Sequence, residues 1–147
     1  MAIPKIIQIP IGDEGALQYH YKRIEISSAE ILTTNSVPTV FPIDAPGAGY
    51  ILLPITSLVS YDFVSVVYGT NTTIGIYYTG GVLPIYDLTQ VPGTDIITLG
   101  ADAISSYNAV PNIPIENATL ELREPTGDPT GGDGTLVIYL WYIILKL

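Results

Sequence analysis

Side chains suited to catalysis are scarce in this sequence. His20 is the single histidine, and it lies between Tyr19 and Tyr21 in an alternating segment typical of a strand. General acid–base catalysis needs a histidine or paired carboxylates in a cleft, and a serine nucleophile needs a motif such as G-x-S-x-G, which the sequence lacks. The adjacent acids Asp13 and Glu14 lie beside glycines, as in a solvated turn. We therefore expect a protein that is not an enzyme and has no catalytic residue.

Two acids near the C-terminus could bind a metal. Asp128 and Asp133 bracket Pro-Thr-Gly-Gly, and acids around glycines can hold calcium through carboxylate and carbonyl oxygens. This spacing differs from that of the EF-hand loop, and a plain turn explains it equally well. We expect a turn with no metal and no cofactor, and keep a calcium-dependent, lectin-like domain as an alternative.

Aromatic side chains suggest a second kind of binding. The chain has 11 tyrosines and 1 tryptophan, and Tyr77, Tyr78 and Tyr86 are candidates for stacking on sugar rings. Tyrosine is also favoured in strands and at protein interfaces, so packing is the simpler interpretation.

Charge and composition exclude several partners. The net charge is −9, from 14 acids against 5 scattered bases, so binding to nucleic acid or to an anionic membrane is not expected. The chain has no cysteine, which excludes disulfides and thiolate sites. No signal peptide is recognisable at the N-terminus, and the apolar stretch 136–147 is shorter than the roughly 20 residues of a transmembrane helix. We expect a soluble chain that is not processed.

The elements that must position these residues are strands. Hydrophobic residues make up 48% of the chain, and 14 glycines and 12 prolines interrupt any long helix. We predict an all-β fold: an antiparallel, jelly-roll-like β-sandwich formed by residues 19–147. One or two helical turns are predicted at 101–107. The predicted strands are 19–27, 30–34, 37–43 at an edge, 51–60, 63–68, 74–79, 83–88, 95–99, 116–124 and 135–147.

Residues 1–18 are predicted to form an extended N-terminal arm. Pro4 and Pro10 alternate with isoleucines, which favours an extended backbone and disfavours a central strand. The arm either packs along the edge of its own domain or reaches a neighbouring subunit. The candidate partner contacts are Lys5, Ile6, Ile7 and Ile9.

The final strand is apolar on both faces. An outer sheet face normally meets water, and a wet aromatic face forfeits several kcal/mol at about 25 cal/mol per Å². The N-terminal arm or another subunit must therefore cover one face, and we favour a subunit contact. The residues expected to fill the core and the subunit interface are Ile138, Leu140, Trp141, Tyr142 and Ile143.

Two segments, 26–63 with its APGAG turn and 117–147 with its PTGGDGT turn, resemble small all-β virion proteins of tailed bacteriophages, most of all capsid decoration (cement) proteins. The resemblance implies a jelly-roll-like homotrimer on the outer surface of the capsid. Such a trimer would clamp neighbouring subunits of the major capsid protein and be made in the host cytoplasm. A receptor- or glycan-binding module of a phage tail or head fibre is the alternative.

Overall fold

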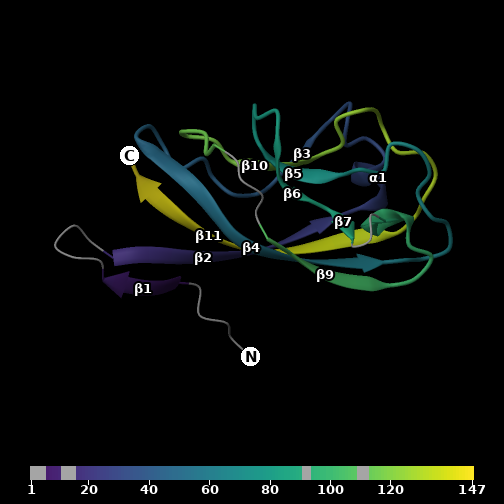
Figure 1. The fold of residues 1–147 in the computed structure, drawn as a ribbon, viewed down its shortest axis with the longest axis horizontal. Coiled ribbons are helices and arrows are strands. Elements are labelled where there is room, and N and C mark those ends of the chain that lie inside the picture. Colours follow the sequence, from purple (N-terminus) through teal and green to yellow (C-terminus); the bar gives the residue numbers. More distant parts are fainter. Residues whose placement is uncertain (1–5, 11–15, 91–93, 109–112) are drawn as a thin grey trace.

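Two antiparallel sheets form the molecule. The structure is a computed structural model that describes residues 6–10, 16–90, 94–108 and 113–147. The broad sheet has the order β1-β2-β11-β4-β9, and its strands span Ile6–Pro10, Ala16–Ile26, Thr135–Lys146, Tyr50–Asp62 and Ala103–Asn108. The facing sheet has the order β3-β10-β5-β6, with strands Thr39–Val40, Leu120–Arg123, Gly75–Tyr78 and Pro84–Asp87. Figure 1 shows the facing sheet layered over the broad one.

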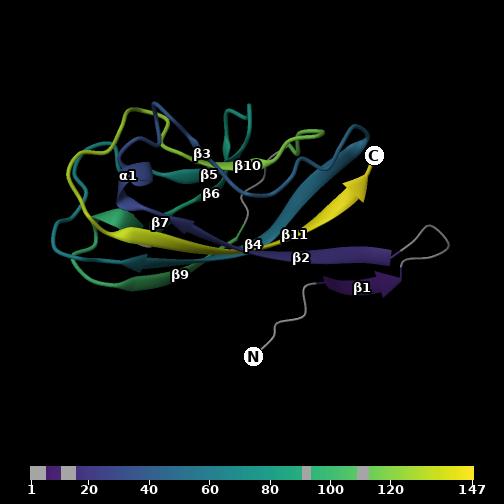
Figure 2. The same ribbon diagram turned by 180° about the vertical axis from the view of Figure 1, so that it is seen from behind.

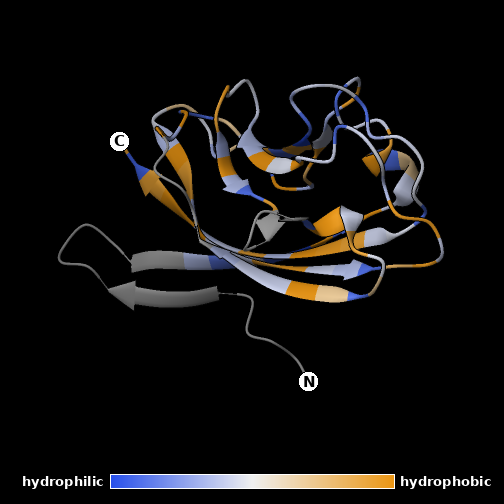
Figure 3. Ribbon diagram, turned by 45° about the vertical axis from the view of Figure 1, so that its right-hand side comes forward, coloured by the Kyte–Doolittle hydropathy of each residue, from blue (hydrophilic) through white to orange (hydrophobic). Residues whose placement is uncertain are grey.

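The strand order is that of a jelly roll. Without β1 and the small β7–β8 pair (Thr89–Gln90 and Thr94–Asp95), eight strands remain. Counted along the chain, the first, eighth, third and sixth form one sheet, and the second, seventh, fourth and fifth form the other. The predicted antiparallel, jelly-roll-like sandwich is therefore confirmed. Hydrophobic residues recur along the strands of both sheets (Figure 3).

Period-two alternation along the strands builds the core. On β11, Leu136, Ile138 and Leu140 are fully buried against the facing sheet, while the residues between them point outward and are half-buried. On β10, Leu120 and Leu122 face the same core, as the sequence predicts. Burial of these side chains is the main force that holds the two layers together.

The broad sheet bends at a β-bulge. The pairing of β11 with β4 shifts between Trp141, opposite Thr56, and Tyr142, opposite Pro54, which leaves Ile55 as the extra residue. A bulge is where a central strand tolerates proline, because the ladder is already interrupted there. The bulge lets β4 and β11 diverge from β2 toward their far ends (Figures 1 and 2).

Two predicted strands are wrong because side chains hold the backbone in other conformations. Within 30–34 the prediction fails because α1, Ser28–Ile31, occupies the start of this segment. Ser27 and Glu30 form a capping box at its N-terminus, a signature that the strand prediction overlooked. Residues 63–68 form a loop, whose polar contacts are described below.

Two further predictions are wrong between β8 and β9. Residues 96–98, predicted as part of a strand, form a 3₁₀ turn, Ile96–Thr98. The helical turns predicted at 101–107 are replaced by β9, which pairs with the central strand β4. Tertiary pairing outweighs local propensity in β9.

The N-terminal stretch contributes an edge strand. β1 pairs with Ala16–His20 of β2 in antiparallel register, so β2 begins inside the stretch expected to form the arm. Lys5 lies outside the described residues, and for Ile6, Ile7 and Ile9 only the backbone is described. β1 extends the broad sheet at its edge (Figure 2).

Candidate interaction surface

His20 packs against an aromatic ring of the neighbouring strand β11. Its ring stacks on Tyr142, with centroids 5.0 Å apart and planes 14° apart. Its Nε2 is buried without a hydrogen-bond partner among the described residues. Asp13 and Glu14 lie outside the described residues. Within the described part of the chain, the histidine therefore serves packing.

The two acids considered for calcium belong to different loop contacts. The Asp128 carboxylate accepts the N–H groups of Asn35 and Ser36 at 2.8 and 2.9 Å. The Asp133 carboxylate accepts the N–H groups of Ser65 and Val66 and the Ser65 hydroxyl. These hydrogen bonds lower the pKa of both acids, with the Ser36 N–H foremost for Asp128 and the Ser65 hydroxyl foremost for Asp133. Across the described ranges, no group of three or more potential ligands could hold a metal.

The three tyrosines proposed for sugar stacking are buried. Tyr77, Tyr78 and Tyr86 are 4%, 2% and 0% exposed, which agrees with the packing interpretation and leaves no ring surface for stacking on a sugar. Burial raises the pKa of all three hydroxyls, that of Tyr78 to about 12. Both faces of β5 are covered, and these rings therefore belong to the packing of the sandwich.

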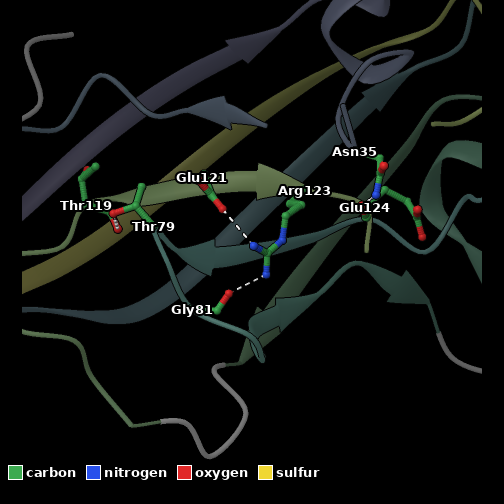
Figure 4. A network of polar contacts seen from close by, with 7 residues as sticks. All are labelled: Asn35, Thr79, Gly81, Thr119, Glu121, Arg123 and Glu124. Carbon is green, nitrogen blue, oxygen red and sulfur yellow. Dashed lines mark hydrogen bonds and ion pairs between the residues drawn. The ribbon is translucent and has the colours of Figure 1, made fainter. Parts of the chain in front are cut away.

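A polar network covers the outer side of the facing sheet (Figure 4). The Arg123 guanidinium lies 4.2 Å from the Tyr77 ring centroid, donates to the Gly81 carbonyl at 2.6 Å, and pairs with Glu121 at 3.3 Å. Gly75 leaves space beside the Tyr77 ring, since a Cβ there would lie 3.1 Å from that ring and 2.9 Å from the Tyr86 carbonyl oxygen. This network explains why Tyr77 is buried on an outer face.

Glu121 is buried although it lies on the outer side of the facing sheet. Alternation along β10 places it opposite the core-facing Leu120 and Leu122, yet it is only 7% exposed. Burial raises the pKa of Glu121, and the nearby Arg123 partly offsets that effect. The next acid, Glu124, is fully buried and accepts the N–H groups of Thr126 and Gly127. Glu124 therefore stabilises the turn that follows β10, and Glu121 belongs to the polar network on the outer side of the facing sheet.

The outer side of the broad sheet carries a cluster of aromatic residues. We call it the aromatic face: Tyr21 and Arg23 on β2, Tyr139 and Trp141 on β11, and Leu58 on β4. The Tyr21 ring lies 5.2 Å from Trp141 and 6.5 Å from Tyr139, and the Arg23 guanidinium lies 5.9 Å from the Tyr139 ring. The four apolar or aromatic side chains are half-buried and Arg23 is exposed.

Within the described ranges, neither sheet covers the outer side of this face. The facing sheet covers the opposite side of the broad sheet, and β1 continues it sideways (Figures 1 and 2). Arg23 also pairs with Glu25. Aromatic residues with arginine and few other charges are the composition that marks the centre of protein interfaces.

Of the five residues predicted for the core and the interface, four are buried within the chain and one lies on the aromatic face. Ile138 and Leu140 are fully buried, and Tyr142 is 8% exposed beside His20. Ile143 is 6% exposed, so the structure already covers it. Trp141 is the one of the five that joins the aromatic face.

Sequence reasoning missed the partners of Trp141. Tyr21, Arg23 and Leu58 lie far from it in sequence and reach it through strand pairing. The alternation of Tyr19, Tyr21 and Arg23 places them on one side of a strand, but it does not show that this strand lies beside β11.

Among the helices of the described residues, none has the length and apolar character needed to cross a membrane.

The comparisons with known proteins give one loose likeness. No family model and no curated protein matches the chain. A chain of the cyanophage Pam1 capsid asymmetric unit resembles it at a TM-score of 0.48 and 12% sequence identity, over 97% of this chain and 91% of that one. A superposition this loose carries no conclusion about function.

Proposed function

We propose that this chain is a non-enzymatic structural protein of a phage virion. In this proposal it is a capsid decoration protein that forms a homotrimer and stabilises the head by bridging subunits of the major capsid protein. The observation that carries the proposal is the aromatic face, a cluster of large apolar rings on the open side of the broad sheet. Such an apolar surface supports a protein whose role is to bind other protein subunits.

Energetics favour a covered aromatic face. A large aromatic side chain can bury roughly 150–250 Å², and each Å² of apolar surface removed from water contributes about 25 cal/mol. Covering the remaining exposed area of Trp141, Tyr139 and Tyr21 would thus stabilise an assembly by several kcal/mol on this order-of-magnitude basis. An uncovered patch of this kind promotes non-specific association.

The other features agree with a structural role. Jelly rolls occur in viral capsids and in lectins, so the fold permits both proposed functions without choosing between them. The acids once considered for chemistry hold loops instead. The resemblance of segments 26–63 and 117–147 to phage decoration proteins supports the first function.

In the same proposal, the N-terminal arm contacts a neighbouring capsid subunit. β1 is the terminal strand of the broad sheet, and an edge strand can pair with a strand of another chain. Lys5, Ile6, Ile7 and Ile9 would provide these contacts.

The proposal predicts binding to phage heads that depends on Trp141. Purified heads of the encoding phage, stripped of this chain, should bind the full chain saturably, and imaging should locate it on the capsid surface. Trp141→Glu should weaken this binding at least about tenfold, because it places a charge in an apolar contact. Val82→Glu is the matched control, since Val82 is 86% exposed on a turn of the facing sheet.

Two results would contradict the proposal. One is density for the chain on the tail alone. The other is a folded monomer that ignores heads and binds a glycan saturably through Trp141, which would favour the fibre module instead.

A further inference from the structure

We propose that the segment 124–134, which joins β10 to β11, fastens three surface loops at one end of the sandwich, and that acid releases these loops together. The three loops are 33–37, 63–68 and 69–72. They lie with the segment at the end of the sandwich away from the C-terminus (Figure 1). The inference is independent of what the protein binds, because it concerns contacts within one chain.

The loop 33–37 is held by Asp128. The Asp128 carboxylate accepts the N–H groups of Asn35 and Ser36 at 2.8 and 2.9 Å. The Asn35 side-chain amide donates to the Glu124 carbonyl at 2.8 Å. Hydrogen bonds to an ionised carboxylate are stronger than those to a neutral group, so protonation of Asp128 weakens this attachment.

The loop 63–68 is held by Asp133. The Asp133 carboxylate accepts the N–H groups of Ser65 and Val66 at 3.0 and 2.9 Å. The Asp133 N–H donates to the Val66 carbonyl at 3.2 Å, and the Tyr68 hydroxyl donates to the Gly134 carbonyl at 2.6 Å. The same segment thus binds a second loop through a second carboxylate.

The loop 69–72 is bound to the segment by its backbone. Gly69 and Thr130 exchange two N–H to carbonyl hydrogen bonds, of 2.7 and 3.0 Å, and the Asn71 side-chain amide donates to the Asp128 carbonyl at 3.1 Å. Thr70 and Asn71 have φ angles of +30° and +53°, a region that costs energy for residues other than glycine. This strained backbone persists only while the segment holds it, so the loop relaxes when the segment moves.

Two glycines keep the segment in close contact with the loops. A Cβ at Gly127 would lie 2.6 Å from the Asn71 side-chain nitrogen, and one at Gly132 would overlap the Tyr68 ring. Gly132 also has a φ of +87°, which glycine adopts without penalty. Because one tightly fitted segment contacts all three loops, the release of one loop should loosen the others.

Two further carboxylates hold the same loops from other elements. Asp95 accepts the Thr72 hydroxyl at 2.6 Å, and Asp102 accepts the Phe63 N–H at 2.9 Å. Acid that protonates these groups weakens the remaining attachments of the loops as well. Protonation therefore removes holding contacts on both sides of the loops.

The hydrogen bonds set the pH at which release begins. They lower the pKa of Asp128 and of Asp133, with the Ser36 N–H foremost for the first and the Ser65 hydroxyl foremost for the second. Both acids are half-buried, so solvent protons can reach them. Their stabilisation is fully present above about pH 4, near the unfolded pKa, and is lost as the pH falls through the native pKa.

The other titratable groups at this end leave that direction unchanged. Tyr61 and Tyr68 interact with the charge of Asp133, and both hydroxyls stay neutral in acid because burial raises their pKa. Glu124, in the same segment as Asp128, accepts the N–H groups of Thr126 and Gly127, so its protonation also weakens the segment.

The first test measures amide hydrogen exchange of the full chain by NMR at neutral pH and at about pH 3, with each rate divided by that of the unfolded chain at the same pH. The N–H groups of Asn35, Val66 and Gly69 report on the three loops, and those of β11 report on the core. Loop protection should fall at least about tenfold more than core protection. Unchanged loop protection in acid, or an equal loss in loops and core, would overturn the inference.

The second test asks whether the loops open together. At neutral pH, Asp128→Asn should lower the protection of Val66, and Asp133→Asn should lower that of Asn35, each at least about threefold, although neither carboxylate contacts that N–H in the first case or the second. Asp44→Asn, which changes an exposed acid in another loop, should leave all three loops unchanged. Folded variants that each loosen only the loop they contact would show independent attachments and overturn the inference.

Discussion

Single hydroxyl groups differ in what they contribute to this sandwich. Tyr78 and Tyr86 are both buried on strands of the facing sheet. The Tyr78 hydroxyl donates to the Leu52 carbonyl at 2.7 Å, across the core to the broad sheet. The Tyr86 hydroxyl is buried without a hydrogen-bond partner among the described residues. Removing one oxygen atom from each therefore has different consequences.

Tyr78→Phe should destabilise the fold by about 1 kcal/mol, because it leaves the Leu52 carbonyl without this donor. Tyr86→Phe should be neutral or stabilising, since it removes a buried polar group that gains no bond in the native state. Urea unfolding of both variants at neutral pH measures the difference. Equal destabilisation of the two would contradict this assignment.

At the scale of elements, the loop 63–68 is held by one carboxylate, because Asp133 accepts hydrogen bonds from Ser65 and Val66. The hydrogen bonds to Asp133 lower its pKa below the usual value of about 3.9. The stabilisation is therefore fully present above about pH 4 and is lost as the pH falls through the native pKa.

Asp133→Asn should lower the melting temperature at pH 7, and the gap to the wild type should close on acidification. Differential scanning calorimetry between pH 7 and about pH 2 measures this. Asp44→Asn, which changes an exposed acid in another loop, is the control. A gap of constant size across the range would show that the carboxylate charge is not what orders the loop.

Elements with strong alternation could be predicted from the sequence. The long apolar strand β11 and the hairpin around Gly80 follow from local pattern and turn residues. Residues 63–68 could not be predicted, because the anchors of this loop, Asp102 and Asp133, lie about 40 and 70 residues away in the chain. Local β-propensity there competes with contacts that only the folded chain provides.

For the candidate site, the sequence predicted the tryptophan but not its surroundings. Two apolar faces on one strand required a cover for Trp141, and that inference came from residues 136–145 alone. The position of Tyr21 and Leu58 beside it depends on strand register, which joins distant segments. Composition left sugar stacking open for Tyr77, Tyr78 and Tyr86, and their burial agrees with the packing interpretation that the sequence favoured.

At the scale of the whole molecule, the proposed homotrimer brings a second chain against the first. Among the described residues, the rings of the aromatic face are only half-buried, and the proposed assembly would cover them. The net charge of −9 opposes close approach of copies at low salt, so the apolar contact must outweigh that repulsion. Screening by moderate salt should therefore favour assembly.

Trp141 itself provides the most direct measurement, because it is the single tryptophan of the chain. We would record its fluorescence emission and its quenching by acrylamide while diluting the protein, with the mass followed by light scattering. If the chain forms the proposed trimer, the tryptophan should be protected and blue-shifted in the trimer, and should show a red shift with stronger quenching as the trimer dissociates into folded monomers. A folded monomer at every concentration, whose tryptophan remains fully quenchable even when heads are added, would contradict it.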